Sequence, residues 1–216
     1  MEGILDLLNS DLGKTIISGV SGSTGTDQNK TGSVLTMALP VLMKAMERNA
    51  STPEGAQGLM GALSSKHDGS ILDNLGGLFG GGVDESVTTD GDKILGHVLG
   101  NSRRGVEQVI GQKSGVDASS VGNILKVAAP ILMGLLGKQS RQNNVSSQSD
   151  LTSLLGGLLG GASQSGPVTK EQTFLEQVLD SDGDGSVIDD VAGMLLGGGS
   201  KKKSGLGGLL GGLFGK

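Results

Sequence analysis

The sequence predicts an all-α protein: an internally duplicated multi-helical bundle with Pro-kinked helices, glycine-rich linkers and a C-terminal helix–loop–helix. Apolar residues recur at the i, i+3, i+4 and i+7 spacing of amphipathic helices in several segments. One such unit occurs twice, so that Asp27 corresponds to Asp117 and Pro40–Met43 corresponds to Pro130–Met133, a displacement of 90 residues. The correspondence extends over about 40 positions without a gap, which is typical of a true internal duplication.

The duplication and shifts in composition divide the chain into four parts. Residues 1–82 form the first helical repeat with a glycine-rich end, and residues 83–161 form the second repeat with a similar end. Residues 162–197 contain a linker and an acidic helix–loop–helix. Residues 198–216 are a basic, glycine- and leucine-rich tail, which is expected to be flexible.

The amino-acid composition restricts how the core is built. There is no Trp or Tyr and there are only three Phe, so burial must come from Leu, Ile, Val, Met and Ala. Glycine supplies 41 of the 216 residues, well above the usual share of about 7%. Because glycine weakens a helix interior by about 1 kcal/mol relative to alanine, we expect well-formed helices joined by mobile glycine-rich connections.

Charge and cysteine content exclude several classes of protein. A net charge of −5 and the near absence of aromatic residues argue against nucleic-acid binding. A chain without cysteine has no disulfide, no thiolate zinc site and no cysteine nucleophile. The first residues carry acids where a signal peptide carries bases, and no run of 18 apolar residues predicts a membrane-spanning helix. The expected location is the cytoplasm.

The first repeat begins with a predicted helix over residues 3–20, interrupted at Gly13. A loop at residues 21–26 leads to Asp27, which is a good helix N-cap because its carboxylate can accept from free first-turn amides. The helix that follows has an apolar stripe with the spacing of a buried helical face: Val34, Leu35, Ala38, Val41, Leu42, Ala45 and Met46.

Pro40 lies within this stripe, and Pro130 lies at the same place in the second repeat. A proline inside a helix removes one backbone hydrogen bond and clashes with the preceding turn, so it either kinks the helix or starts a new one. A bend that wraps the helix around the core is favoured over a functional hinge.

A weaker helix is predicted over residues 53–65, because Thr52-Pro53 is a good N-cap and first-turn pair. Glycine-rich Leu-Gly-Gly-Leu segments follow at residues 71–82 and again at 155–161. Residues 83–90 are predicted to be a polar join.

The second repeat is predicted to contain two helices between Ile94 and Leu136. Arg103 and Arg104 are assigned to a solvated helix face. The Gln-, Ser- and Asn-rich residues 138–150 are predicted to be a flexible join.

The second repeat resembles the YidB-like bacterial proteins, a domain family of unknown function. The resemblance is carried by Asp90–Gly100, Ser114–Val116 and Ala128–Gly134, and the first repeat shares it more weakly. It implies an all-helical fold and a bacterial source. The family has no established activity to carry over.

The strongest candidate site is the acidic loop at residues 180–190. Ca²⁺ takes six or more oxygen ligands, and carboxylates at alternate positions with a glycine for the sharp turn can surround one ion. Asp180, Asp182 and Asp184 occupy the first, third and fifth positions of an EF-hand-like loop, and Gly185 occupies the sixth. The carbonyl of Ser186 would supply the seventh-position ligand.

The second half of this loop departs from the EF-hand pattern. Ile188 and Val191 fill the ninth and twelfth positions, and Asp189 and Asp190 come early, as in shortened acidic loops. The loop resembles EF-hand-like or dockerin-like loops, which occur at the C-terminus of some YidB-like proteins. We predict a Ca²⁺ site formed by Asp180, Asp182, Asp184, Ser186, Asp189 and Asp190. The alternative is an Asp- and Gly-rich turn that binds nothing.

The remaining signals are weaker. His67 and His97 are the only histidines, lie far apart in the sequence and lack metal-ligand spacing, so His97 is assigned to a partly exposed helix surface. The tail after Lys201–Lys203 could contact an anionic membrane or drive self-association. A flexible tail is the alternative reading.

The sequence therefore predicts a non-catalytic binding or interaction protein with one Ca²⁺ site. Its partner would be an unidentified protein or a second copy of the chain. The alternative is a self-associating structural or membrane-surface protein that acts through its Gly/Leu segments. An enzyme is not expected, because it would need groups such as His97 and Asp90 or Asp92 to converge in a concave pocket.

Overall fold

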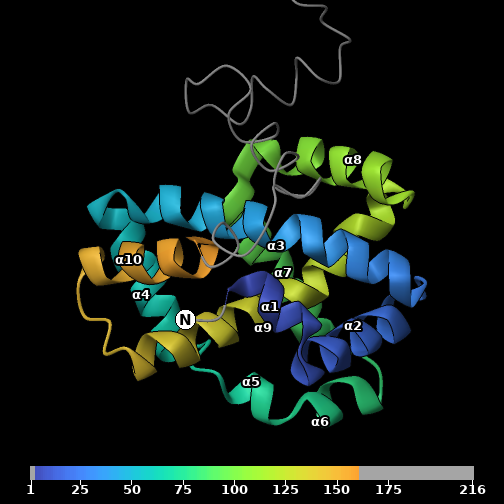
Figure 1. Ribbon diagram of the computed structural model, residues 1–216, viewed down its shortest axis with the longest axis horizontal. Helices are drawn as coiled ribbons and strands as arrows, with labels where there is room; N and C mark the ends of the chain where they lie inside the picture. Colours follow the sequence, from blue (N-terminus) through green and yellow to red (C-terminus); the bar gives the residue numbers. More distant parts are fainter. Residues whose placement is uncertain (1–2, 161–216) are drawn as a thin grey trace, which may run out of the picture.

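The computed structural model describes residues 3–160, and this part of the chain consists of helices without a strand (Figure 1). Its elements are α1 Ile4–Asn9, α2 Asp11–Thr24, α3 Gln28–Ala50, α4 Pro53–Ser65, α5 Ser70–Asp73, α6 Leu75–Gly80, α7 Glu85–Leu99, the short 3₁₀ helix η1 Gly100–Ser102, α8 Arg103–Ser114, α9 Ala118–Gln142 and α10 Gln148–Gly160. The predicted all-α bundle is confirmed.

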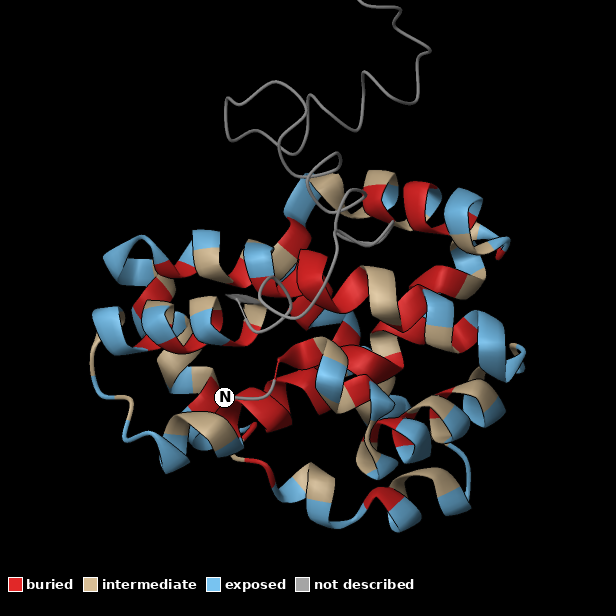
Figure 2. Ribbon diagram, in the orientation of Figure 1, coloured by how far each residue is buried: buried red, intermediate tan, exposed pale blue. Residues whose placement is uncertain are grey.

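The two proline-containing helices, α3 and α9, form the centre of the bundle. Each continues without interruption across its proline, Pro40 in α3 and Pro130 in α9, and each proline is buried. Neither proline therefore starts a new helix. The other helices pack around these two, and buried residues concentrate along α3 and α9 while exposed ones face outward (Figure 2).

The joint before each long helix has the same geometry in both repeats. Gly25 ends α2 and Gly115 ends α8, and both adopt the left-handed backbone conformation with φ of 67°. Asp27 then caps α3 by accepting hydrogen bonds from two first-turn amides, and Asp117 caps α9 by accepting from the amide of Ser120. Glycine suits this turn because an L side chain is strained at positive φ.

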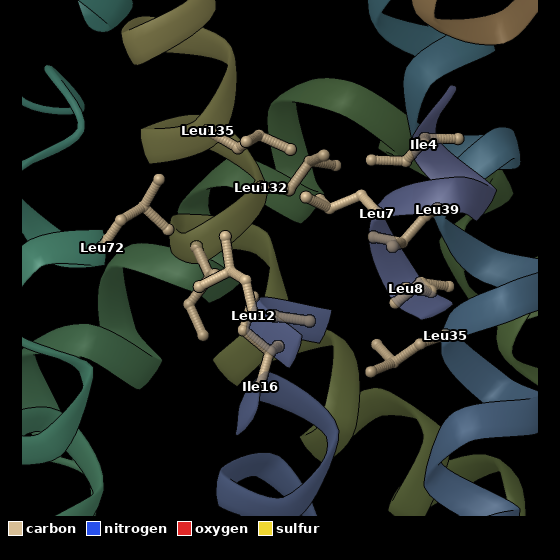
Figure 3. A pocket seen from close by; sticks show the side chains of 12 residues that line it. Ile4, Leu7, Leu8, Leu12, Ile16, Leu35, Leu39, Leu72, Leu132 and Leu135 are labelled. Atoms are coloured by element: carbon tan, nitrogen blue, oxygen red, sulfur yellow. The ribbon is translucent and has the colours of Figure 1, made fainter. Parts of the chain in front are cut away.

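Helices of both predicted repeats contribute to one continuous aliphatic core. The largest fully buried side chains are Ile4, Leu35, Leu42, Met43, Met46, Leu63, Leu95, Ile110, Ile124, Leu125, Leu136 and Leu151. A small cavity of about 20 Å³ remains between α1, α2, α3, α5 and α9 and is lined only by aliphatic side chains (Figure 3). It is a packing defect with room for about one water molecule, too small for an organic ligand.

The Leu-Gly-Gly-Leu segments at 75–80 and 155–160 are helical, so the expectation of mobile connections is wrong at these places. The packing of α6 on α2 depends on a glycine of α2, because a Cβ atom on Gly19 would overlap the ring of Phe79. In α10, the leucines pack mainly on α3 and are buried. The packing of apolar side chains from both helices compensates for the low helix propensity of their glycines.

Three predicted boundaries in the N-terminal half are wrong. The loop expected at 21–26 is helical as far as Thr24, where α2 ends. Residues 3–20 form two helices rather than one, because Ser10 ends α1 and its hydroxyl caps α2 by accepting from the amide of Gly13. The predicted polar join at 83–90 is mostly helical. Asp84 caps α7 through the amide of Ser86, and the polar residues that follow form the first turns of that helix.

Two predictions for the second repeat also fail. A separate helix, α8, lies between the two expected ones, and its buried Val106, Val109 and Ile110 pack toward α9 and α3. The predicted flexible join at 138–150 is short, because α9 continues to Gln142 and α10 begins at Gln148. The polar composition of these residues does not indicate where α9 ends or where α10 begins.

By length and a mean hydropathy of 1.5, α9 could cross a membrane. However, 83% of that apolar window is buried inside the bundle, so α9 has the character of a core helix. Polar residues such as Lys126 interrupt the sequence of α9, so the helix contains no run of 18 consecutive apolar residues.

Candidate binding groove

A groove of about 800 Å³ lies between α4 and α7, and we call it the α4–α7 groove. Both helices pack on α3 and α9, which close the groove from below. Its walls are stripes along the two helices: Gly55, Gly58, Leu59, Ala62 and Lys66 on and just after α4, and Asp90, Lys93, Ile94, His97 and Val98 on α7. The i, i+3 and i+4 spacing places each set on one helix face.

Small residues and end contacts keep the groove open. Gly55, Gly58 and Ala62 place little side-chain volume on the α4 wall. At one end, the side-chain amide of Asn49 donates to the carbonyl oxygens of His97 and Val98 at 3.2 and 3.4 Å, tying the end of α3 to α7. The separation of α4 from α7 is therefore built into the way both helices are anchored.

The floor of the groove is apolar. Met46 from α3 and Met133 from α9 are 1% and 3% exposed, and Ile94 is 9% exposed. Leu59 and Val98 on the walls are partly exposed. Methionine is flexible and polarizable and adapts to irregular apolar surfaces, so this floor suits an apolar side chain of variable shape.

The far end of the groove contains a histidine–carboxylate pair. His67 is buried, and its Nε2 lies 3.4 Å from Oδ2 of Asp90, while Nζ of Lys66 lies 3.7 Å from Oδ1 of the same carboxylate. Burial lowers the pKa of His67, the nearby Asp90 charge raises it, and Lys66 lowers it, with a net decrease. His67 is thus mainly neutral at neutral pH.

The structure brings His97 into the same groove as His67 and Asp90. The convergence of His97 with Asp90, named above as a requirement for an enzyme, therefore does occur, whereas Asp92 lies elsewhere. His97 is exposed, and its Nδ1 lies 2.8 Å from the carbonyl oxygen of Lys93. Because a carbonyl only accepts, Nδ1 carries a proton in this contact. Among residues 3–160, no cluster of three or more His, Asp or Glu side chains could hold a metal ion.

Asp92 lies outside this groove, in an ion-pair cluster between α7, α8 and α9. Its Oδ1 is 3.0 Å from Arg103 and 3.2 Å from Lys126, and these contacts lower the pKa of Asp92. Arg103 also pairs with Glu107 at 2.8 Å. The prediction of a solvated helix face is therefore wrong for Arg103, whose side chain is only 20% exposed.

The groove also contains hydroxyl and charged groups. Its two hydroxyl groups have structural roles: Ser51 donates to the carbonyl of Arg48, and Thr52 caps α4 through the amide of Gly55. Its rim carries more positive than negative charge when both histidines are neutral. The basic groups are Arg48, Lys66 and Lys93, and the acidic ones are Glu54 and Asp90.

The predicted Ca²⁺ ligands, Asp180, Asp182, Asp184, Ser186, Asp189 and Asp190, lie outside the described residues. The groove could have been suspected from small residues repeated on one face of residues 53–65, but its second wall lies about 35 residues further along the chain. That pairing depends on tertiary packing.

Comparison with known proteins places the chain among bacterial proteins. Residues 6–139 and 141–216 match the profile of a family described as bacterial protein of unknown function (DUF937). The chain belongs to this family. Membership in DUF937 agrees with the resemblance to YidB-like bacterial proteins, and the match covers the acidic loop without assigning it a role. No curated protein and no solved structure matches the chain.

Proposed function

We propose that this DUF937 protein is a non-catalytic binding protein whose α4–α7 groove holds the apolar face of an amphipathic helix. The observation that carries the proposal is the pair of side-chain stripes, one on α4 and one on α7, over a floor of Met46, Ile94 and Met133. The α4 stripe from Gly55 to Lys66 is about 16 Å long, which matches about three helical turns. Helix-in-groove recognition uses such an apolar channel with charged rims.

The basic rim favours a partner helix with acidic flanks. Lys66 and Lys93 are exposed on opposite walls, so carboxylates beside the apolar stripe of a bound helix would meet both. Charge complementarity of this kind increases the rate of association and selects orientation more than it adds affinity.

The absence of Trp and Tyr from the chain allows a direct test. A synthetic amphipathic peptide of about three helical turns, with leucine on one face, glutamate on the other and a single tryptophan, is titrated with the full chain. Tryptophan emission should shift to shorter wavelength and saturate. Val98→Glu should weaken binding, whereas Val87→Glu, on the same helix but outside the groove, should not. Equal binding by both variants would refute the proposal.

We further propose that the C-terminal acidic loop binds one Ca²⁺ ion. Support comes from the alternating carboxylates of Asp180, Asp182 and Asp184 and from Gly185 at the turn position. Without a cation these carboxylates repel one another.

We also propose a cytoplasmic location, because a chain without cysteine suits a reducing compartment.

Self-association is the second candidate function, and a repeated hexapeptide favours it. Leu-Gly-Gly-Leu-Phe-Gly occurs at residues 75–80 and again at 210–215. The first copy is α6, which packs on α2, so the second copy has side chains suited to a similar helical surface. Light scattering over a range of concentrations, with and without anionic vesicles, tests this candidate. A monomer at every concentration that ignores lipid would exclude it, and Phe214→Asp should abolish any association found.

A further inference from the structure

We propose that the α4–α7 groove is occupied by a segment of the same chain, Lys170–Leu179. This inference rests on the proposed function, because it names the helix that the groove holds. A foreign partner would then have to displace this segment, and the groove would be self-blocked in the resting protein.

The apolar residues of the segment match the floor of the groove. Phe174, Leu175, Val178 and Leu179 fall at i, i+1, i+4 and i+5, the spacing of one helical face. Residues 170–180 in a helix would be about 16 Å long, the same length as the α4 stripe. The segment thus presents four apolar side chains to a groove whose apolar floor includes Met46 and Met133.

The charges of the segment complement the rim. Lys170 begins it, Glu171 and Glu176 lie within it and Asp180 follows it directly, so residues 170–180 carry a net charge of −2. The groove presents Lys66 and Lys93 from opposite walls and Arg48 at one end. An acidic helix between basic walls gains electrostatic attraction. A second copy of the chain that docked through its own basic rim would instead meet like charge.

The connecting chain is long enough for the segment to reach the groove. The side chain of Gln148, at the start of α10, donates to the carbonyl of the groove residue Ser51 at 2.9 Å. The 13 residues of α10 extend about 20 Å from that point. From Gly160 to Phe174 the chain can span about 45 Å, and a tether of this kind gives a millimolar effective concentration.

The peptide titration described above tests the inference when it is repeated on full-length variants. The double substitution Leu175→Asp and Val178→Asp removes two apolar anchors of the internal segment. Because this segment then no longer competes for the groove, the peptide should bind at least about tenfold more tightly. Thr173→Asp with Gln177→Asp is the matched control. It adds the same charge on the opposite face of the predicted helix, and peptide affinity should remain that of the unaltered chain.

The outcomes separate this inference from the proposed function. Peptide binding that depends on Val98 but is equal in the unaltered chain and the Leu175→Asp/Val178→Asp variant would overturn self-blocking and leave the helix-binding function standing. No peptide binding to any variant would overturn both.

A second measurement places the segment directly. Phe174→Trp creates the only tryptophan in the chain, and its emission should be that of a buried indole. Adding Val98→Glu should shift the emission to longer wavelength, whereas adding Val87→Glu should leave it unchanged. Charge reversal at Lys66 and Lys93 should act like Val98→Glu, and the same change at Lys30 and Arg104, which lie outside the groove, should not. A solvent-exposed emission in the full chain would overturn the inference.

Discussion

The close approach of α7 to α9 at Gly91 predicts a large loss of stability in Gly91→Ala. A Cβ atom on Gly91 would lie 1.8 Å from the carbonyl oxygen of Lys126 and 2.9 Å from its Cα. Both atoms belong to the backbone of α9, so no side-chain rotation relieves the overlap. A carbon–oxygen contact needs about 3.3 Å, and the two helices must therefore separate by about 1.5 Å at this point.

This separation would loosen a densely packed part of the core. Leu95 on α7 and Leu125 on α9 are both 0% exposed, and dispersion contacts weaken steeply when a gap opens. Overpacking costs roughly 1–3 kcal/mol and occasionally more, while alanine recovers about 1 kcal/mol over glycine in a helix. Because the clash is between backbones, we take the upper end of this range and expect a net loss of about 2 kcal/mol.

Thermal unfolding followed by far-ultraviolet circular dichroism measures the effect, and Gly96→Ala is the matched control. For a domain of this size the loss at Gly91 lowers the midpoint by about 4–8 °C. Gly96 lies on the same helix with nothing within 4 Å of its Cβ position, so its alanine variant should melt about 2–4 °C higher. A Gly91→Ala protein that melts at or above the unaltered chain would refute the described packing of α7 on α9.

Three further predictions concern titratable groups. Hydrogen bonds from Ser119 and Ser120 lower the pKa of Asp117, so its stabilising effect exists above about pH 4 and fades below it; Asp117→Ala should melt lower at pH 7, and the difference should shrink in acid. NMR titration should give His67 a pKa below its ordinary 6.5, and Asp90→Asn should lower it further; because the unfolded state then binds the proton more tightly, this residue should weaken folding below about pH 6.5. A normal His67 pKa would contradict its burial. Isothermal titration should detect one Ca²⁺ site that disappears in Asp182→Asn/Asp184→Asn, and unchanged affinity would exclude the loop as the site.

The parts of the fold that could be predicted are those set by local chemistry. Asp27 and Asp117 indicate the starts of two helices, because a carboxylate just before an apolar stripe can accept hydrogen bonds from the free amides of the first turn. The duplicated apolar stripes identify α3 and α9 as core helices because the 3.6-residue period concentrates their burial on a face. These inferences needed no knowledge of what each helix packs against.

The parts that failed are those where tertiary contacts override local preference. The segment Leu75–Gly80 reads as a connection because glycine disfavours helix, yet it is helical because it packs on α2, where Gly19 leaves room for the ring of Phe79. The polar residues 83–90 suggest a join, yet from Glu85 onward they form the first turns of α7. The next residue of this helix, Gly91, packs against the backbone of α9. At Gly91 the same absence of a side chain that weakens the isolated helix makes the close contact possible, whereas for α6 the glycine that leaves room belongs to the neighbouring helix α2.

The α4–α7 groove follows from the same use of glycine on an outer surface. Where a small residue meets another helix, as at Gly91, the helices approach closely and the space is filled. Where small residues such as Gly58 face a helix held apart by its own anchors, the space remains open: a Cβ atom on Gly58 would meet nothing within 4 Å. Residue type alone does not distinguish the two outcomes, because the difference lies in whether α3 and α9 hold the neighbouring helix near or far. The candidate site therefore had to be found in the packing, although each of its walls is a regular helical stripe in the sequence.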